Sequence, residues 1–88
     1  ADAVRALALS LIRLGEFIVL LACRSESRSH LILARSESLD IDLRTLVPVL
    51  GPIVRGKGGG SPALVEIAGE RGADLDGALA RAEEFLRG

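Results

Sequence analysis

The sequence has few of the residues that carry covalent and metal chemistry. Its 88 residues include one cysteine, Cys23, and one histidine, His30. A single cysteine cannot form an internal disulfide, and this pair cannot supply the four ligands of a structural zinc site. We therefore predict no metal, no cofactor and no catalytic residue in this chain, and we expect a reducing compartment, the cytoplasm.

Aromatic residues and excess charge are scarce as well. Phe17 and Phe85 are the only aromatic side chains, and both fall on predicted apolar faces, so the sequence shows no platform for stacking unpaired bases. The formal net charge is −1, which excludes a protein that coats nucleic acid through a strong overall positive field. Any binding of nucleic acid must therefore use a local patch of charge.

Long apolar runs are missing too. None approaches the ~20 residues needed to span a bilayer, so we predict no membrane partner. The chain starts without methionine and without a basic-then-apolar signal pattern. With 88 residues it is long enough for one small domain, and we interpret residues 1–88 as a single domain excised from a larger protein.

The apolar residues recur at spacings that predict an order of α-β-β-α-β-α. A leading helix is expected over residues 1–15, a central strand over 16–23 and an antiparallel partner strand over 30–34. A helical pattern then begins near Asp40 or Asp42 and contains Pro48 and Pro52, which predict a kink or two short pieces. A third strand over 63–68 and a final helix capped by Asp74 complete the pattern. We predict an α/β fold: a single small domain whose mixed β-sheet of at least three strands is covered by helices, with a right-handed crossover if the second and third strands are parallel.

The most informative stretch is a glycine-rich loop over residues 56–62, Gly-Lys-Gly-Gly-Gly-Ser-Pro. It is close to a P-loop, but Gly58 stands where that motif needs a magnesium-binding Ser or Thr, and the loop follows a helix instead of a strand. The dinucleotide-binding fingerprint fails as well, because its glycines must follow a strand and open a helix, whereas here they follow a helix and precede a strand. What remains is a set of backbone N–H groups beside the cation of Lys57, which suits contact with a phosphate on a larger ligand. A glycine turn with a solvated lysine explains the same residues.

Other polar residues are given structural interpretations. His30 is expected at a strand edge and Cys23 as a small buried packing residue, while Glu66 is expected on an outward face of its strand. Arg71 could join Lys57 and Arg55 in positioning RNA. Three further arginines are interpreted as a solvated face, namely Arg24, Arg28 and Arg35.

From about residue 16 to residue 88, the succession of an apolar hairpin, Ala34-Arg35-Ser36, a helix, Gly56-Lys57-Gly58-Gly59-Gly60-Ser61-Pro62 and an apolar strand resembles the DHHA1 domain. It is most similar to the version at the C-terminus of alanyl-tRNA synthetases and their editing relatives. Ser61, Ala63 and Glu66 depart from that family's pattern. The branch in DHH phosphoesterases usually follows its glycines with a histidine, and none follows Gly60 here, which favours the synthetase-like branch.

This resemblance implies a non-catalytic module that holds the backbone of tRNA, that of alanine tRNA, for an upstream synthetase or editing domain, and that can form a homodimer. Two alternatives stay open: the substrate-binding domain of a DHH-family phosphoesterase or nuclease, and a dimerisation module. The predicted nucleic-acid-binding residues are Lys57, Gly58, Gly59, Gly60, Arg55 and Ser61.

Overall fold

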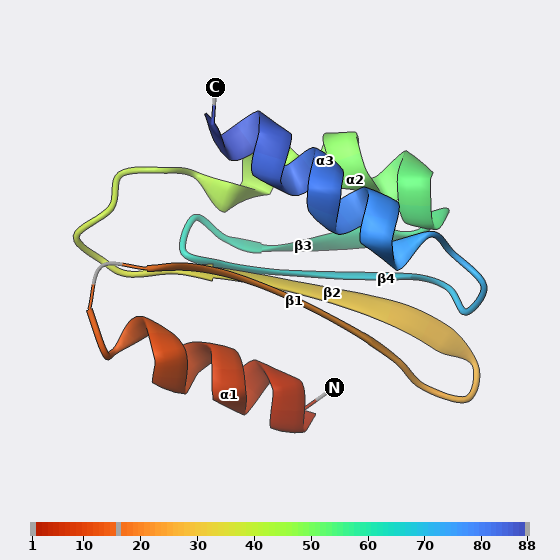
Figure 1. The fold of residues 1–88 in the computed structure, drawn as a ribbon, viewed down its shortest axis with the longest axis horizontal. Helices are drawn as coiled ribbons and strands as arrows, with labels where there is room; N and C mark the ends of the chain where they lie inside the picture. Colours follow the sequence, from red (N-terminus) through yellow and green to blue (C-terminus); the bar gives the residue numbers. More distant parts are fainter. Residues whose placement is uncertain (1, 16, 88) are drawn as a thin grey trace.

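The computed structural model describes residues 2–15 and 17–87. Its elements, in chain order, are α1 (Asp2–Ile12), β1 (Ile18–Arg24), β2 (Arg28–Arg35), the 3₁₀ helix η1 (Leu43–Leu46), α2 (Val47–Val54), β3 (Lys57–Ser61), β4 (Leu64–Glu70) and α3 (Leu75–Arg87). Figure 1 shows these elements as three layers, with the sheet in the middle. The predicted α/β class is confirmed, and the structure adds one strand to the predicted order.

The sheet has four strands in the order β1-β2-β4-β3. Its three pairings are all antiparallel, whereas the sequence led us to expect a mixed sheet. The predicted hairpin of β1 and β2 is confirmed, but β1 lies at an edge of the sheet and not at its centre. Because β2 and β4 are antiparallel, the right-handed crossover that parallel strands would have required does not arise.

The predicted glycine-rich loop over 56–62 is wrong. Residues Lys57–Ser61 form the second edge strand, β3, which turns directly into β4 through Pro62 and Ala63. Glycine disfavours strands because it has no side chain to pack, and for this reason the local sequence predicts a loop. Pairing with the apolar strand β4 overrides that preference, and β4 begins at Leu64, one residue after the predicted start.

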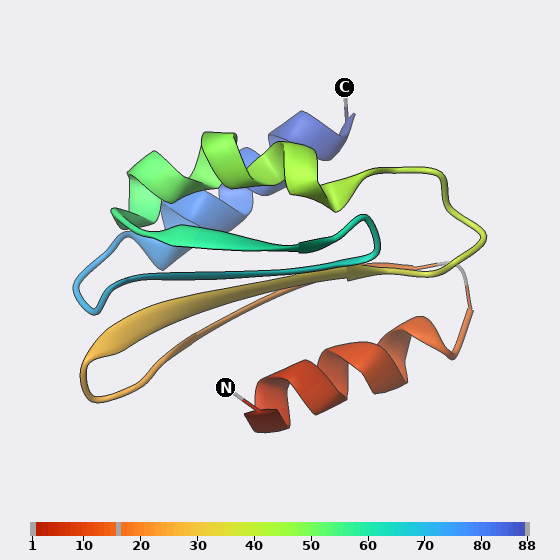
Figure 2. The same cartoon turned by 180° about the vertical axis from the view of Figure 1, so that it is seen from behind.

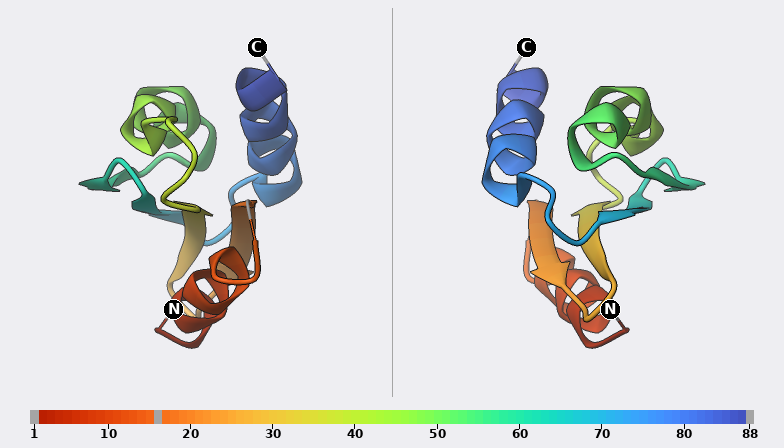
Figure 3. Two further views of the ribbon diagram at one scale, coloured as in Figure 1. Left: turned by 90° about the vertical axis from the view of Figure 1, so that its left-hand side faces the viewer. Right: turned by 90° about the vertical axis from the view of Figure 1, so that its right-hand side faces the viewer.

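Helices cover the two faces of the sheet unequally. In Figures 1 and 2, α2 and α3 lie over one face and α1 lies against the other. The end-on views of Figure 3 show that α1 sits at the β1 and β2 side of the sheet, whereas α2 sits at the β3 side. The packing agrees, because α1 contacts β1 and β2 while α2 contacts β3 and β4. On the α1 side, the helix covers β1 and β2 and reaches β4 at Leu64 and Glu66, whereas the exposed strand β3 lies beyond it.

The apolar side chains form a separate core on each face. The larger core lies between the sheet and the helices α2 and α3, and its buried members include Leu31, Leu46, Val54 and Ile67. The smaller core lies under α1, where Ala8 packs with the buried strand residues Val19, Ile32 and Ala34. Alternate residues of one strand thus enter different cores, as the two-residue period of a strand requires.

Part of the apolar stripe predicted for helix α1 faces solvent and not the core. Val4 and Leu11 pack against the sheet, but Leu7 is 51% exposed and Leu14, beyond the end of the helix, is 76% exposed. Phe17 and Phe85, also predicted on apolar faces, are exposed large hydrophobic residues too. The 3.6-residue period predicted the helix correctly, whereas the identity of its buried side depends on contacts with β1 and β2.

Two prolines shape the segment that precedes β3. Asp42 caps η1 by accepting a hydrogen bond from the Arg44 backbone N–H at 3.0 Å, and α2 continues the chain with Pro48 in its first turn and Pro52 in its interior. The expectation of two short pieces is confirmed. The final helix begins as predicted, because the Asp74 carboxylate accepts a hydrogen bond from the Gly77 N–H at 2.9 Å. Within the described chain, none of the helices is long and apolar enough to cross a membrane.

Candidate nucleic-acid interface

The glycines of β3 have two different roles in the strand. A Cβ atom added to Gly58 would come within 2.2 Å of the Glu66 carbonyl oxygen, and one added to Gly60 would come within 2.1 Å of the Leu64 carbonyl oxygen. Side chains do not fit there, so close approach to β4 requires glycine. A Cβ on Gly59 would meet nothing within 4 Å. The absence of a side chain at Gly59 is therefore not explained by packing.

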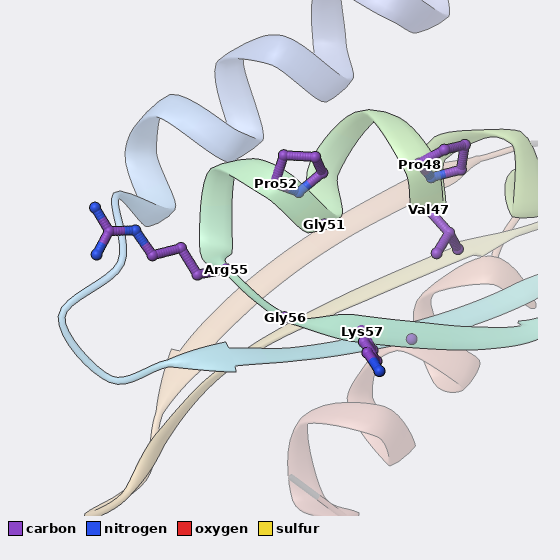
Figure 4. Close-up of a pocket in the computed structure, with 8 residues that line it drawn as sticks. Val47, Pro48, Gly51, Pro52, Arg55, Gly56 and Lys57 are labelled. Atoms are coloured by element: carbon purple, nitrogen blue, oxygen red, sulfur yellow. The ribbon is translucent and has the colours of Figure 1, made fainter.

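Lys57 stands at the beginning of β3, opposite Ala68, which is in turn opposite His30. Figure 4 shows its side chain pointing away from α2. The cation therefore projects on the α1 side of the sheet, at the edge strand that α1 does not cover. All five residues of β3 are exposed, so the strand presents its backbone together with this charge.

Arg55 ends α2 in an unusual backbone conformation. Its φ and ψ are 54° and 51°, the left-handed region that normally takes glycine at a helix C-terminus, and its N–H donates to the Gly51 carbonyl. A non-glycine residue held there is strained by roughly 1 kcal/mol. The guanidinium lies 3.4 Å from Glu70, but both side chains are mostly exposed, so this ion pair contributes about 0–1 kcal/mol. The sequence thus keeps an arginine where glycine would fit with less strain.

Arg55 and Lys57 line a hollow of about 390 Å³ at the end of the sheet. A third cation, Arg28 at the start of β2, joins them, and the strand register places it opposite Glu70. The remaining lining residues are Ser27, Gly56, Ala68, Gly69 and Glu70. Three cations and one carboxylate therefore surround a space bordered by the glycine strand, an arrangement that attracts phosphate groups.

Arg28 is the residue that sequence reasoning missed, since it was interpreted as part of a solvated face. Residues 28 and 70 meet only through the register of β2 with β4, and no local motif marks this pairing. Arg71, by contrast, was expected among the positioning cations. Its Nε donates to the Ser25 carbonyl oxygen at 3.2 Å, while Arg24 donates to the carbonyl oxygens of Arg71 and Ala73 at 2.8 and 2.6 Å. These bonds tie the β1–β2 turn to the β4–α3 turn and so hold Arg28 near the hollow.

The predicted site residues do not all converge. Arg55 and Lys57 meet at the hollow, whereas Gly58, Gly59, Gly60 and Ser61 run away from it along β3. At about 3.3 Å per residue, Ser61 lies roughly 13 Å from Lys57. The structure therefore gives a cationic hollow with a side-chain-poor strand leading away from it.

The other polar residues considered in the sequence, His30, Cys23 and Glu66, do not line the hollow. His30 and Cys23 are opposite one another in the register of β1 and β2, and the His30 Nε2 atom is 3.3 Å from the Ser25 hydroxyl oxygen. Glu66 lies on β4 with its carboxylate 3.6 Å from the Arg5 guanidinium of α1. Within residues 2–15 and 17–87, no group of three or more His, Cys, Asp or Glu side chains is placed to hold a metal ion.

Comparison with known proteins shows the fold. The chain is similar to the C-Ala domain of the alanyl-tRNA synthetase from Aquifex aeolicus, with a TM-score of 0.88 and 21% sequence identity. The match covers 99% of this chain and 81% of that one. No protein-family model matches the sequence. At this level of identity, the likeness establishes a shared architecture over the full length of the chain.

Proposed function

We propose that this chain is a non-catalytic, DHHA1-like module of an alanyl-tRNA synthetase or alanyl-tRNA editing protein, and that it holds tRNA for aminoacylation or editing. The parent protein acts in the cytoplasm, and an upstream domain performs the chemistry. Support comes from the likeness to the C-Ala domain, a part of an alanyl-tRNA synthetase. The glycine-rich pattern at residues 56–62 supports the same family by resemblance.

The observation that carries the proposal is the meeting of Arg28, Arg55 and Lys57 around one hollow beside an exposed strand. The phosphates of a folded RNA dock against these cations, and the backbone of the RNA passes along β3, where Gly59 offers no side chain to obstruct it. Such contacts position an RNA by its shape and charge and do not read its bases. They suit a chain without an aromatic stacking platform and with a formal net charge of −1.

The test is a titration of the 88-residue chain with folded tRNA and, separately, with single-stranded DNA of equal length, at low and at physiological salt. Lys57→Glu is the first variant, and Arg81→Glu is its control, because Arg81 is exposed on α3 and undergoes the same change of charge. We expect Lys57→Glu to weaken tRNA binding about tenfold and to reduce the salt slope by about one, since one phosphate contact is lost.

Three results would contradict the proposal in different ways. Equal effects of Lys57→Glu and Arg81→Glu would mean that the charge of the whole chain, and not the hollow, governs binding. Tighter binding to the single strand would favour the substrate-binding domain of a DHH-family phosphoesterase or nuclease. If neither nucleic acid binds and the chain sediments as a dimer, the dimerisation module is the better description.

A further inference from the structure

A second depression lies between β3 and α2, next to the hollow, with which it shares Arg55, Gly56 and Lys57. It has a volume of about 620 Å³, and Figure 4 shows Val47, Pro48 and Pro52 above the strand. The glycines that complete its lining are Gly51, Gly56 and Gly58. Among the described residues that line it, the charged ones are Arg55 and Lys57, and the Lys57 side chain points to the opposite face of β3. We call this depression the α2–β3 groove.

The groove opens beside an unprotected strand edge. In an antiparallel pair, alternate residues turn their N–H and C=O groups away from the partner strand, so β3 directs half of its backbone groups outward. Within the described part of the chain, β4 is the only strand that pairs with β3, and no hydrogen bond joins Lys57–Ser61 to a backbone group outside the sheet. Edge strands are usually guarded by charged residues, prolines, bulges or a covering element. Lys57 is the single charge within β3, followed by three residues without side chains.

We propose that β3 and the α2–β3 groove bind an extended, acidic segment of another protein as a fifth strand of the sheet. The backbone of the segment pairs with the free edge of β3 and its alternate apolar side chains enter the groove. Its acidic groups lie near Arg55 at the end of the groove and near Lys57 on the opposite face of the strand. Strand addition of this kind takes affinity from main-chain hydrogen bonds and specificity from pockets for every second side chain. The inference does not rest on the proposed function.

The dimensions of the groove fit such a segment. Pro48 and Pro52 are four residues apart in α2, which corresponds to a rise of about 6 Å along the helix. Side chains that share one face of an extended strand are about 6.6 Å apart. Figure 4 shows α2 running above β3 with the two proline rings spaced along the strand. Two successive inward side chains of the bound segment can therefore each contact one proline.

The experiment is a titration of the ¹⁵N-labelled chain with a capped synthetic peptide in which valine alternates with threonine and each end carries an aspartate. The control peptide has the same composition, but its valines are consecutive. We expect the alternating peptide to shift the amide signals of β3 and of the first turn of α2 and to slow hydrogen exchange in β3. The control peptide should bind at least tenfold more weakly.

The groove is tested separately with Pro48→Asp. Pro48 is exposed, and an acidic residue is favourable in the first turn of a helix, so the chain should stay folded. The added negative charge faces the acidic peptide, and we expect a loss of at least tenfold in affinity. Ser10→Asp, an exposed position in α1, adds the same charge at another surface and should leave peptide binding unchanged.

Four outcomes would overturn the inference. The β3 signals could stay unchanged at millimolar peptide, or the two peptides could bind equally. Slow exchange of β3 amides that depends on protein concentration without peptide would assign the edge to a second copy of this chain. Folded tRNA could perturb the groove signals, including Val47 and Gly51, while the peptide does not, which would make the groove part of an RNA surface. Neither peptide result bears on the Lys57→Glu test, so the two proposals fail independently.

Discussion

The Oγ atom of Ser36 lies 2.6 Å from the carbonyl oxygen of Gly15, the residue that ends the turn after α1. The same oxygen accepts a hydrogen bond from the Phe17 N–H at 2.9 Å, and it lies 3.0 Å from the Ile12 carbonyl oxygen. Ser36 is buried, being only 6% exposed. One hydroxyl therefore joins the end of β2 to both sides of the connection between α1 and β1.

We predict that Ser36→Ala destabilises the chain by about 1–3 kcal/mol, because the Phe17 N–H and the nearby carbonyl oxygens lose a buried partner. Urea unfolding followed by circular dichroism measures this change. Ser38→Ala, at an exposed position two residues further on, should change the free energy of unfolding by less than about 0.5 kcal/mol. Equal effects of the two substitutions would show that Ser36 does not anchor α1.

Gly58→Ala and Gly59→Ala should behave differently although the two residues are neighbours. The Cβ atom that Gly58→Ala introduces would overlap the Glu66 carbonyl oxygen, and we expect a loss of about 1–3 kcal/mol as the strands separate. The space around Gly59 is open, so Gly59→Ala should stay within about 0.5 kcal/mol of the parent chain.

Thermal unfolding compares the stability of these two variants, and tRNA titration of the stable one then reports on function. Weaker tRNA binding by a fully folded Gly59→Ala chain would place this part of β3 in the contact surface. Unchanged binding would limit the RNA contact to the cations of the hollow.

Two substitutions at Arg55 separate its effect on the stability of the chain from its effect on tRNA binding. We predict that Arg55→Gly is more stable than Arg55→Ala by up to about 1 kcal/mol, because glycine adopts a φ of 54° without the strain that alanine retains. Both variants lose the same guanidinium, so both should bind tRNA equally weakly. Denaturant unfolding and a tRNA titration on the same pair of proteins check the two statements, and a difference in their affinities would mean that the loop conformation, not the charge, governs binding.

Stability at acid pH should depend on Asp42. The Arg44 side chain bonds both carboxylate oxygens, with Nε to Oδ1 at 3.0 Å and Nη2 to Oδ2 at 2.8 Å, and this holds the pKa of Asp42 below its ordinary value. A pKa that is lower in the folded chain adds stability above the unfolded pKa, and this stability is lost as the pH falls through the folded pKa.

We therefore expect Asp42→Asn to be less stable than the parent chain at pH 7 and to lose less stability as the pH falls from about 5 to about 2. Urea unfolding over this range measures both curves. Asp40→Asn, at a neighbouring exposed position, serves as the control. Parallel curves for the parent chain and Asp42→Asn would contradict the prediction.

The sequence predicted those elements whose signals are local. Asp74 and Asp42 cap helices where their side chains reach backbone N–H groups a few residues ahead, and the β1–β2 hairpin follows from two apolar runs with a short connection. The strand β3 was missed because three successive glycines have no β-preference of their own. Its formation depends on pairing with the apolar strand β4 across the two-residue turn of Pro62 and Ala63, which the strand preferences of its own residues do not indicate.

The candidate site also has a part that local sequence predicts and a part that it does not. Arg55 and Lys57 are close in sequence, and the structure places both at one hollow. Arg28 reaches the same hollow from another strand, through a register that must be correct across two apolar strands before the residue can be placed. The exposure of Leu7 has a similar origin, since an apolar stripe shows that a helix is amphipathic but not how it is rotated against its sheet.

The strand order also decides which step of folding is costly. Both hairpins, β1–β2 and β3–β4, join neighbours along the chain, and they can form on a microsecond scale. The seam between β2 and β4 instead pairs residue 34 with residue 64 and residue 28 with residue 70. The entropy of closing this long loop, which holds η1 and α2, must be lost before the contacts of the seam are gained. We therefore expect closure of the seam to be the slowest step of folding, and the larger core, which contains residues of both β2 and β4, to form with it.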